Sequence, residues 1–106
     1  MTRQRRELPT RRHCETFELA FGNLHTKHIV SLGLYANGEV GEVFINFPRS
    51  GLQAEAIGRD AAVLISLCLQ YGVPLTVLSG AVTRDPRGEP SSIVGAVLDT
   101  LAEEKI

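Results

Sequence analysis

The chain has 106 residues, a length that accommodates one domain with a single hydrophobic core and leaves little room for a second. Its formal charge is -1, from 11 basic and 12 acidic side chains, so bulk charge does not make the molecule a binder of polyanions. Two cysteines are too few for a disulfide framework, and no long uncharged apolar run predicts a membrane span. No apolar stretch typical of a secretory signal follows the first arginines, so the cytoplasm is the expected compartment.

Arginines crowd the start of the chain. Residues 1–12 are basic, polar and aperiodic, so we expect a flexible basic arm ahead of a single domain over residues 13–106. Such an arm could hold phosphate or nucleic acid electrostatically, although no set of aromatic stacking residues accompanies it. The arm contains Arg3, Arg5, Arg6, Arg11 and Arg12.

Three segments then alternate apolar and polar residues, as half-buried strands do. In the first, Phe17, Leu19 and Phe21 share one face. Between the second and third, Asn37-Gly38 predicts a hairpin, because a type I′ turn needs positive φ at both central residues. Short connections between successive strands predict an antiparallel meander. The predicted strands are residues 13–21, 28–35 and 40–47.

The second half of the chain predicts helices. The longest covers residues 53–71 and has a broad apolar side with a narrow polar strip opposite, so we expect it to be largely buried, with the apolar side toward the core. A short helix at 74–82 and a last helix capped by Ser91 or Ser92 follow. The apolar side of the long helix consists of Ala54, Ile57, Ala61, Leu64, Ile65 and Cys68, and the polar strip of Glu55, Arg59, Ser66 and Gln70.

The order βββααα fits an α+β fold, in which a three-stranded antiparallel meander is followed by three helices packed on one face as a two-layer sandwich. The other face of the sheet would then carry Ile29, Tyr35 and Phe44. Three apolar residues on adjacent strands can form a patch that seeks a partner. We therefore expect a homodimer or a docking surface through this sheet face.

Metal and cofactor chemistry find little support in the sequence. His13, Cys14, His25 and His28 are the only group that could indicate a metal. Zinc sites need convergent ligands, usually with paired spacings, and here the cysteines stand far apart without a CxxC. Nucleotide, hydrolase and zincin motifs are absent as well. We expect no metal and no cofactor.

Cys14 and Asp60 are the candidates for an independent enzyme. The arginines before Cys14 favour a thiolate, and an ordinary strand cysteine is the alternative. Asp60 projects toward the apolar side of the long helix, where a bare carboxylate is costly, so we expect a structural ion pair with Arg12, or else with Arg84. No base, nucleophile and orienting group can be assembled from the spacings, so no catalytic residue is predicted.

Four short segments carry a family resemblance. They are LPTRRHCETF at 8–17, RDAAVL at 59–64, GVPL at 72–75 and RGEPSS at 87–92, the last ahead of Gly95 and Leu98-Asp99. In this order they resemble the TSCPD domain, which occurs at the C-terminus of adenosylcobalamin-dependent ribonucleotide reductases and as short free-standing proteins. The resemblance covers residues 8–104.

Departures from the family pattern limit what the resemblance implies. The Thr-Ser-Cys-Pro-Asp string that names the domain does not occur, and Ser92-Ile93 stands where Ser-Pro is expected. No cysteine-rich tail follows Glu104, so a reducing pair or metal knuckle is not implied. The catalytic barrel of a ribonucleoside-diphosphate reductase is missing, so we expect no enzyme activity from this chain by itself.

The resemblance implies a non-catalytic accessory or interaction module that self-associates or docks on a reductase-like partner. The alternative is a small module that binds a phosphate ligand, a nucleotide or nucleic acid through the arginine-rich arm and the loop at 84–92. The residues expected to make binding contacts are Arg11, Arg12, Glu15, Arg84 and Arg87.

Overall fold

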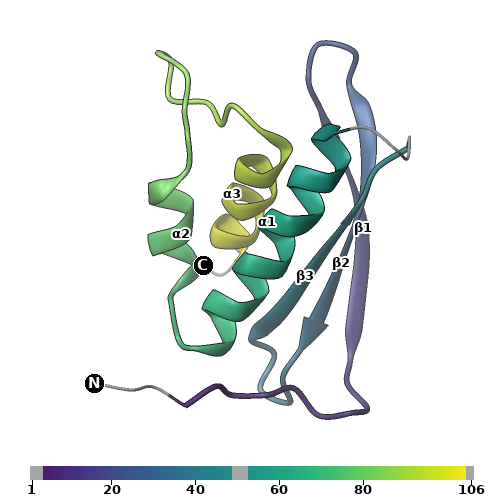
Figure 1. The fold of residues 1–106 in the computed structure, drawn as a ribbon, viewed down its shortest axis with the longest axis vertical. Helices are drawn as coiled ribbons and strands as arrows, with labels where there is room; N and C mark the ends of the chain where they lie inside the picture. Colours follow the sequence, from purple (N-terminus) through teal and green to yellow (C-terminus); the bar gives the residue numbers. More distant parts are fainter. Residues whose placement is uncertain (1–3, 49–52, 105–106) are drawn as a thin grey trace.

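The computed structural model describes residues 4–48 and 53–104. Three antiparallel strands form one sheet in the order β1-β2-β3, and three helices follow to one side of it (Figure 1). The elements are β1 (Cys14–Phe21), β2 (Thr26–Leu34), β3 (Val40–Asn46), α1 (Gln53–Gln70), α2 (Leu75–Ala81) and α3 (Ile93–Glu104). The predicted α+β class, meander and element order are confirmed.

The hairpin between β2 and β3 turns at the predicted residues but with a different turn type. Gly38 has a φ of +89°, whereas Asn37 is not in the positive-φ region. The N–H of Gly38 donates to the carbonyl of Tyr35 at 2.9 Å, and the N–H of Tyr35 donates to the carbonyl of Glu39 at 2.8 Å. These bonds describe a type I turn followed by a left-handed glycine, so the predicted type I′ turn is wrong.

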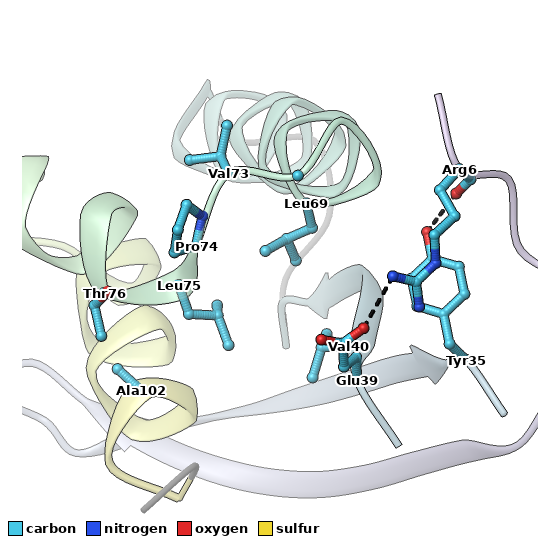
Figure 2. Close-up of a pocket in the computed structure, with 11 residues that line it drawn as sticks. Arg6, Tyr35, Glu39, Val40, Leu69, Val73, Pro74, Leu75, Thr76 and Ala102 are labelled. Carbon is cyan, nitrogen blue, oxygen red and sulfur yellow. Dashed lines mark hydrogen bonds and ion pairs between the residues drawn. The ribbon is translucent and has the colours of Figure 1, made fainter. Parts of the chain in front are cut away.

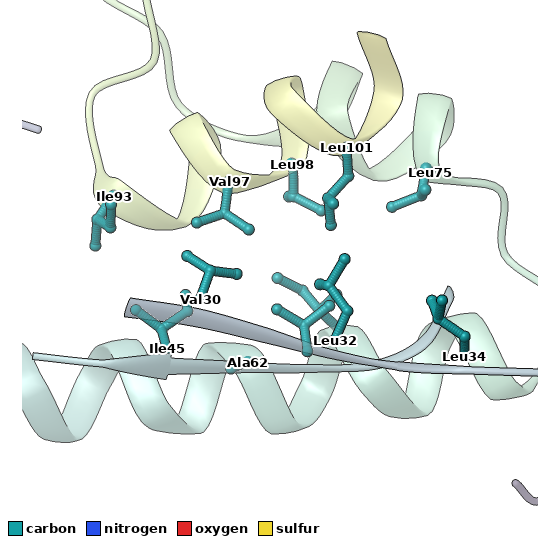
Figure 3. Close-up of a cluster of buried hydrophobic side chains, with 12 residues drawn as sticks. Val30, Leu32, Leu34, Ile45, Ala62, Leu75, Ile93, Val97, Leu98 and Leu101 are labelled. Carbon is teal, nitrogen blue, oxygen red and sulfur yellow. The ribbon is translucent and has the colours of Figure 1, made fainter. Parts of the chain in front are cut away.

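The core lies between the inner face of the sheet and the helices. In Figure 3, Val97 and Leu98 of α3 point toward Val30 and Leu32 of β2. Phe17 and Leu19 of β1 pack against the same cluster from the sheet, as their alternation predicts. The buried residues of the cluster are Val30, Leu32, Leu34, Val43, Ile45, Ala62, Ile65, Leu75, Ile93, Val97, Leu98 and Leu101.

The long helix α1 turns its polar strip inward, opposite to the prediction. Ser66 and Gln70 are buried, whereas Ile57 and Leu64 are 61% and 62% exposed. Of the side predicted to face the core, only Ile65 is buried. The predicted orientation of this helix is therefore wrong.

The edge of β3 explains this orientation. The backbone groups of Val43 and Gly41 point away from β2, so the sheet leaves them unpaired. Ser66 Oγ accepts the N–H of Val43 at 2.9 Å, and Gln70 Nε2 donates to the carbonyl of Gly41 at 2.9 Å. Because buried backbone groups need hydrogen-bond partners, the polar strip of α1 lies against this edge.

The loop between α2 and α3 contains a tight turn at residues 85–88. The N–H of Gly88 donates to the carbonyl of Asp85 at 2.9 Å, and Gly88 has a φ of +86°. Of the two predicted caps, Ser92 is used, since its Oγ accepts the N–H of Gly95 at 3.1 Å. The loop thus ends on a defined helix start.

Candidate functional site

The N-terminal segment, expected to be flexible, lies against the domain over residues 4–12. The N–H of Arg6 donates to the carbonyl of Gln70 at 2.8 Å, and the hydroxyl of Tyr35 donates to the carbonyl of Arg6. The guanidinium of Arg6 lies 3.5 Å from the centroid of the Tyr35 ring and pairs with Glu39 at 2.9 Å. These contacts tie the described part of the segment to the domain, whereas the sequence predicts a flexible arm over residues 1–12, of which residues 1–3 lie outside the described residues.

A pocket of about 340 Å³ opens beside this stack (Figure 2). Its wall is largely apolar and includes Leu69 at the end of α1 and Pro74 and Leu75 at the start of α2. The charge of Arg6 at its rim is already balanced by Glu39. The pocket therefore offers apolar space and no unbalanced charge from this pair.

The predicted binding residues are not brought together. The segment before β1 and the loop between α2 and α3 lie at opposite ends of the long axis (Figure 1), so arm and loop do not form one small-ligand site. Arg12 is engaged by Glu42, with Nε and Oε1 2.6 Å apart. Arg11, Glu15 and Arg87 are exposed.

Arg84 forms a two-bond ion pair with Asp99 of α3. Its Nη2 lies 2.7 Å from Oδ1 and its Nη1 lies 2.9 Å from Oδ2, and Ser79 Oγ also donates to Oδ1 at 2.7 Å. The hydrogen bond from Arg84 lowers the pKa of Asp99, with a smaller lowering from Ser79, against desolvation that raises it. The pair joins the loop to α2 and α3 and has a structural role.

Asp60 does not form the predicted ion pair. It is exposed on α1, and its two expected partners are engaged elsewhere, Arg12 with Glu42 and Arg84 with Asp99. The predicted buried carboxylate at this position is therefore wrong. Glu42 is the carboxylate that fixes the start of β1, since its side chain is 14% exposed and that of Arg12 is 28% exposed.

The predicted patch on the outer face of the sheet is smaller than expected. Tyr35 is buried beneath Arg6 and is not available to a partner, while Phe44 is 51% exposed and Ile29 is half-buried. Phe44 and Ile29 remain on that face.

A second apolar surface lies on the exposed side of α1 and at Tyr71, which follows its last residue. Ile57, Leu64 and Tyr71 follow at intervals of seven residues, and Ala61 and Cys68 lie between them. We call these five residues the α1 seam. The seven-residue spacing is visible in the sequence, but periodicity alone does not say which side of a helix meets the core.

The cysteine and histidine candidates do not come together in a catalytic or metal-binding arrangement among the described residues. Cys14 is exposed, with Sγ 3.8 Å from the carbonyl of Arg12. His28 is buried, with Nδ1 3.1 Å from the carbonyl of Thr26 and its ring edge-on to Phe47. Within residues 4–48 and 53–104, no three His, Cys, Asp or Glu side chains could hold a metal ion. In the same ranges, no helix is long and apolar enough to cross a membrane.

Comparison with known proteins identifies relatives of this chain. A vitamin B12-dependent ribonucleotide reductase of Agrobacterium fabrum is 35% identical over 94 residues, which cover 89% of this chain and 7% of that protein. The enzyme of the same name from Bradyrhizobium diazoefficiens is 35% identical over 81 residues, 76% of this chain and 6% of that protein. The one from Rhodopirellula baltica is 29% identical over 106 residues, 93% of this chain and 10% of that protein.

The chain thus spans between 6% and 10% of the length of these relatives. No solved structure gives a significant match. The TSCPD domain family matches residues 2–105, nearly the whole chain and including the N-terminal segment that packs on the domain. The chain belongs to the TSCPD domain family.

Proposed function

We propose that this chain is a non-catalytic interaction module that docks on a reductase-like partner through the α1 seam. The observation that carries the proposal is the exposure of Ile57, Leu64 and Tyr71 at seven-residue intervals. This spacing is the geometry with which two helices pack side by side. The occupant that fits is therefore an apolar helix laid along α1.

The family supports a reductase-like protein as the source of that helix. The relatives are named as ribonucleotide reductases, and the matched region is a small part of each. A reductase-like protein is therefore the partner that the family resemblance suggests for the seam. A cytoplasmic location alongside nucleotide metabolism remains a prediction.

The charge within the seam favours a partner over a second copy. Asp60 lies beside Leu64 on the exposed side of α1. Two copies packed antiparallel around Leu64 would place Asp60 against Cys68, which offers no positive charge, and desolvating an unpaired carboxylate is costly. A partner helix with a Lys or Arg opposite Asp60 removes this cost. We therefore favour such a helix over the homodimer.

The phosphate-binding alternative has weaker support. Arg6 and Arg12 of the N-terminal segment are paired with Glu39 and Glu42, and Arg5 is hydrogen-bonded to Gln70. Arginines already paired with carboxylates have less to offer a phosphate. A nucleotide held by this segment alone is thus the second choice.

Isothermal titration of this chain against a ribonucleotide reductase purified from the same cells tests the docking proposal. We expect Leu64→Glu to weaken binding at least tenfold, because a charge at the centre of an apolar contact opposes its burial. The matched control is Val77→Glu on α2, since Val77 is similarly exposed but lies outside the seam.

Two results would overturn the docking proposal. One is that the wild type and Leu64→Glu bind the reductase equally well, or that neither binds it. The other is light scattering that shows a wild-type dimer and a Leu64→Glu monomer, since this would make a second copy the occupant of the seam.

A further inference from the structure

A second pocket, of about 320 Å³, lies between α1 and β3 on the margin of the sheet. We call it the α1–β3 groove. Arg5 and Arg59 line it, and between them Phe44, Val63 and Leu67 contribute apolar surface. It is separate from the seam, which faces away from the sheet.

The two arginines lie toward opposite ends of this groove. Gln70 bonds Gly41 and Ser66 bonds Val43, so α1 and β3 run antiparallel. Arg5 Nε donates to Gln70 Oε1 at 2.5 Å, which places Arg5 at the Gln70 end. Arg59 precedes Gln70 by eleven residues, about 16 Å along a helix that rises 1.5 Å per residue. A single phosphate cannot bridge this span.

The span suits an extended peptide. A strand advances about 3.3 Å per residue, so positions i and i+4 of an extended peptide lie about 13 Å apart, and the long side chains on both sides cover the remaining distance. Side chains at positions i, i+2 and i+4 of an extended chain point to the same side. Positions i and i+4 would then meet the arginines, and position i+2 the apolar middle.

The groove carries an unbalanced positive charge. Arg5 is bonded to the neutral amide of Gln70, and the ion pairs found in residues 4–48 and 53–104 do not include it. Glu42, the acidic residue that lines the groove, is already paired with Arg12. Arg59 forms an exposed i,i+4 pair with Glu55, a weak kind of ion pair, so it can also approach a second carboxylate but contributes less than Arg5.

The middle of the groove offers exposed apolar surface from two elements. Phe44 of β3 is 51% exposed and Val63 of α1 is 57% exposed. An apolar side chain laid between them would remove surface of both from water.

Recognition in this groove has to use side chains. The side chains of Ser66 and Gln70 already hydrogen-bond to the backbone of Val43 and Gly41, so a peptide cannot add as a fourth strand at these residues. Single-stranded nucleic acid fits less well, because it needs several stacking rings and a run of cations. The groove has one aromatic ring, and the chain carries a net charge of -1.

The geometry points to an extended acidic peptide segment of a partner protein as the ligand of the α1–β3 groove, with carboxylates four residues apart and an apolar side chain midway. This inference does not rest on the docking of the seam, which is a different surface. It adds a second contact by which the module could recognise a partner.

Fluorescence anisotropy with a labelled peptide whose core is Glu-Ser-Val-Ser-Glu tests the inference. We expect the double variant Arg5→Gln, Arg59→Gln to bind at least tenfold more weakly, and Val63→Ser to weaken binding without changing charge. Arg87→Gln is the matched control, because Arg87 is an exposed arginine in the distant loop. Leu64→Glu should leave peptide binding unchanged, which separates this test from that of the seam.

Three outcomes would overturn the inference. They are the absence of binding at millimolar peptide, equal binding of a Lys-Ser-Val-Ser-Lys peptide, and tighter binding of oligothymidine than of the acidic peptide. The last would make the groove a nucleic-acid site. Urea unfolding of each variant checks that the chain still folds. If the arginine double variant does not fold, Val63→Ser still tests the groove.

Discussion

The hydroxyl of Ser66 meets three backbone groups inside the molecule. Its oxygen accepts the N–H of Val43, and its proton is within reach of the carbonyl of Val43 at 3.3 Å and of Ala62 at 2.8 Å. A serine within a helix normally gains little from its hydroxyl. Here the hydroxyl joins a helix to the edge of a sheet, which explains why a polar residue is buried at this position.

Replacement of Ser66 by alanine should destabilise the fold. The variant leaves the buried N–H of Val43 without a partner, a loss of about 1–3 kcal/mol in the free energy of unfolding. Urea denaturation followed by circular dichroism measures it. Ser91→Ala is the control, since Ser91 is exposed, and should change stability by less than about 0.5 kcal/mol. Equal stability of the two variants would contradict the role given to Ser66.

Individual contacts were the hardest feature to predict from the sequence. The sequence pattern paired Arg12 with Asp60, whereas in the structure Arg12 pairs with Glu42. Glu42 lies on β3, with β2 between it and β1, so its distance from Arg12 depends on strand register, which a helical pattern does not contain. The sequence places Arg5 only within the expected basic arm, whereas in the structure it lines the α1–β3 groove.

At the scale of elements, the strands and the position of the hairpin were predicted well because their signals are local. Two-residue alternation and a nearby Gly or Pro locate each strand to within two residues. The orientation of α1 could not be found in this way. The predicted inward side is the more apolar one, and the structure buries the polar side because β3 needs hydrogen-bond partners at its edge.

Two adjacent residues of α1 test this orientation. Ile65→Ala should cost about 2–5 kcal/mol, the range for truncating a buried aliphatic side chain. Leu64→Ala should change the free energy of unfolding by less than about 0.5 kcal/mol, because Leu64 faces solvent. Chemical denaturation of both variants gives the comparison. A larger loss for Leu64→Ala would restore the orientation that the apolar pattern predicted.

At the scale of the whole molecule, the N-terminal segment closes one end of the domain. It crosses from the end of α1 to the hairpin between β2 and β3, where Arg6 covers Tyr35 (Figure 2). The family was predictable, because motifs in a fixed order carry it. The pockets were not, since each combines residues that are distant in sequence.

Deletion of residues 1–7 tests whether the segment belongs to the domain. The deletion removes a cation–π contact of about 0.5–1 kcal/mol and several hydrogen bonds of about 1 kcal/mol each, so we expect a loss of about 2 kcal/mol or more. Thermal and urea unfolding measure the change, with Arg11→Ala as the control at an exposed position. Unchanged stability after the deletion would favour the flexible arm.

The two tyrosines lie in two separate places, one under the N-terminal segment and the other at the end of the α1 seam. The chain has no tryptophan, so its near-ultraviolet absorption and emission come mainly from Tyr35 and Tyr71. Tyr35 lies beneath Arg6 of the N-terminal segment, and Tyr71 ends the α1 seam. Replacing either by phenylalanine leaves one chromophore, so the unlabelled protein carries an optical reporter for the closed end of the domain and another for occupancy of the seam.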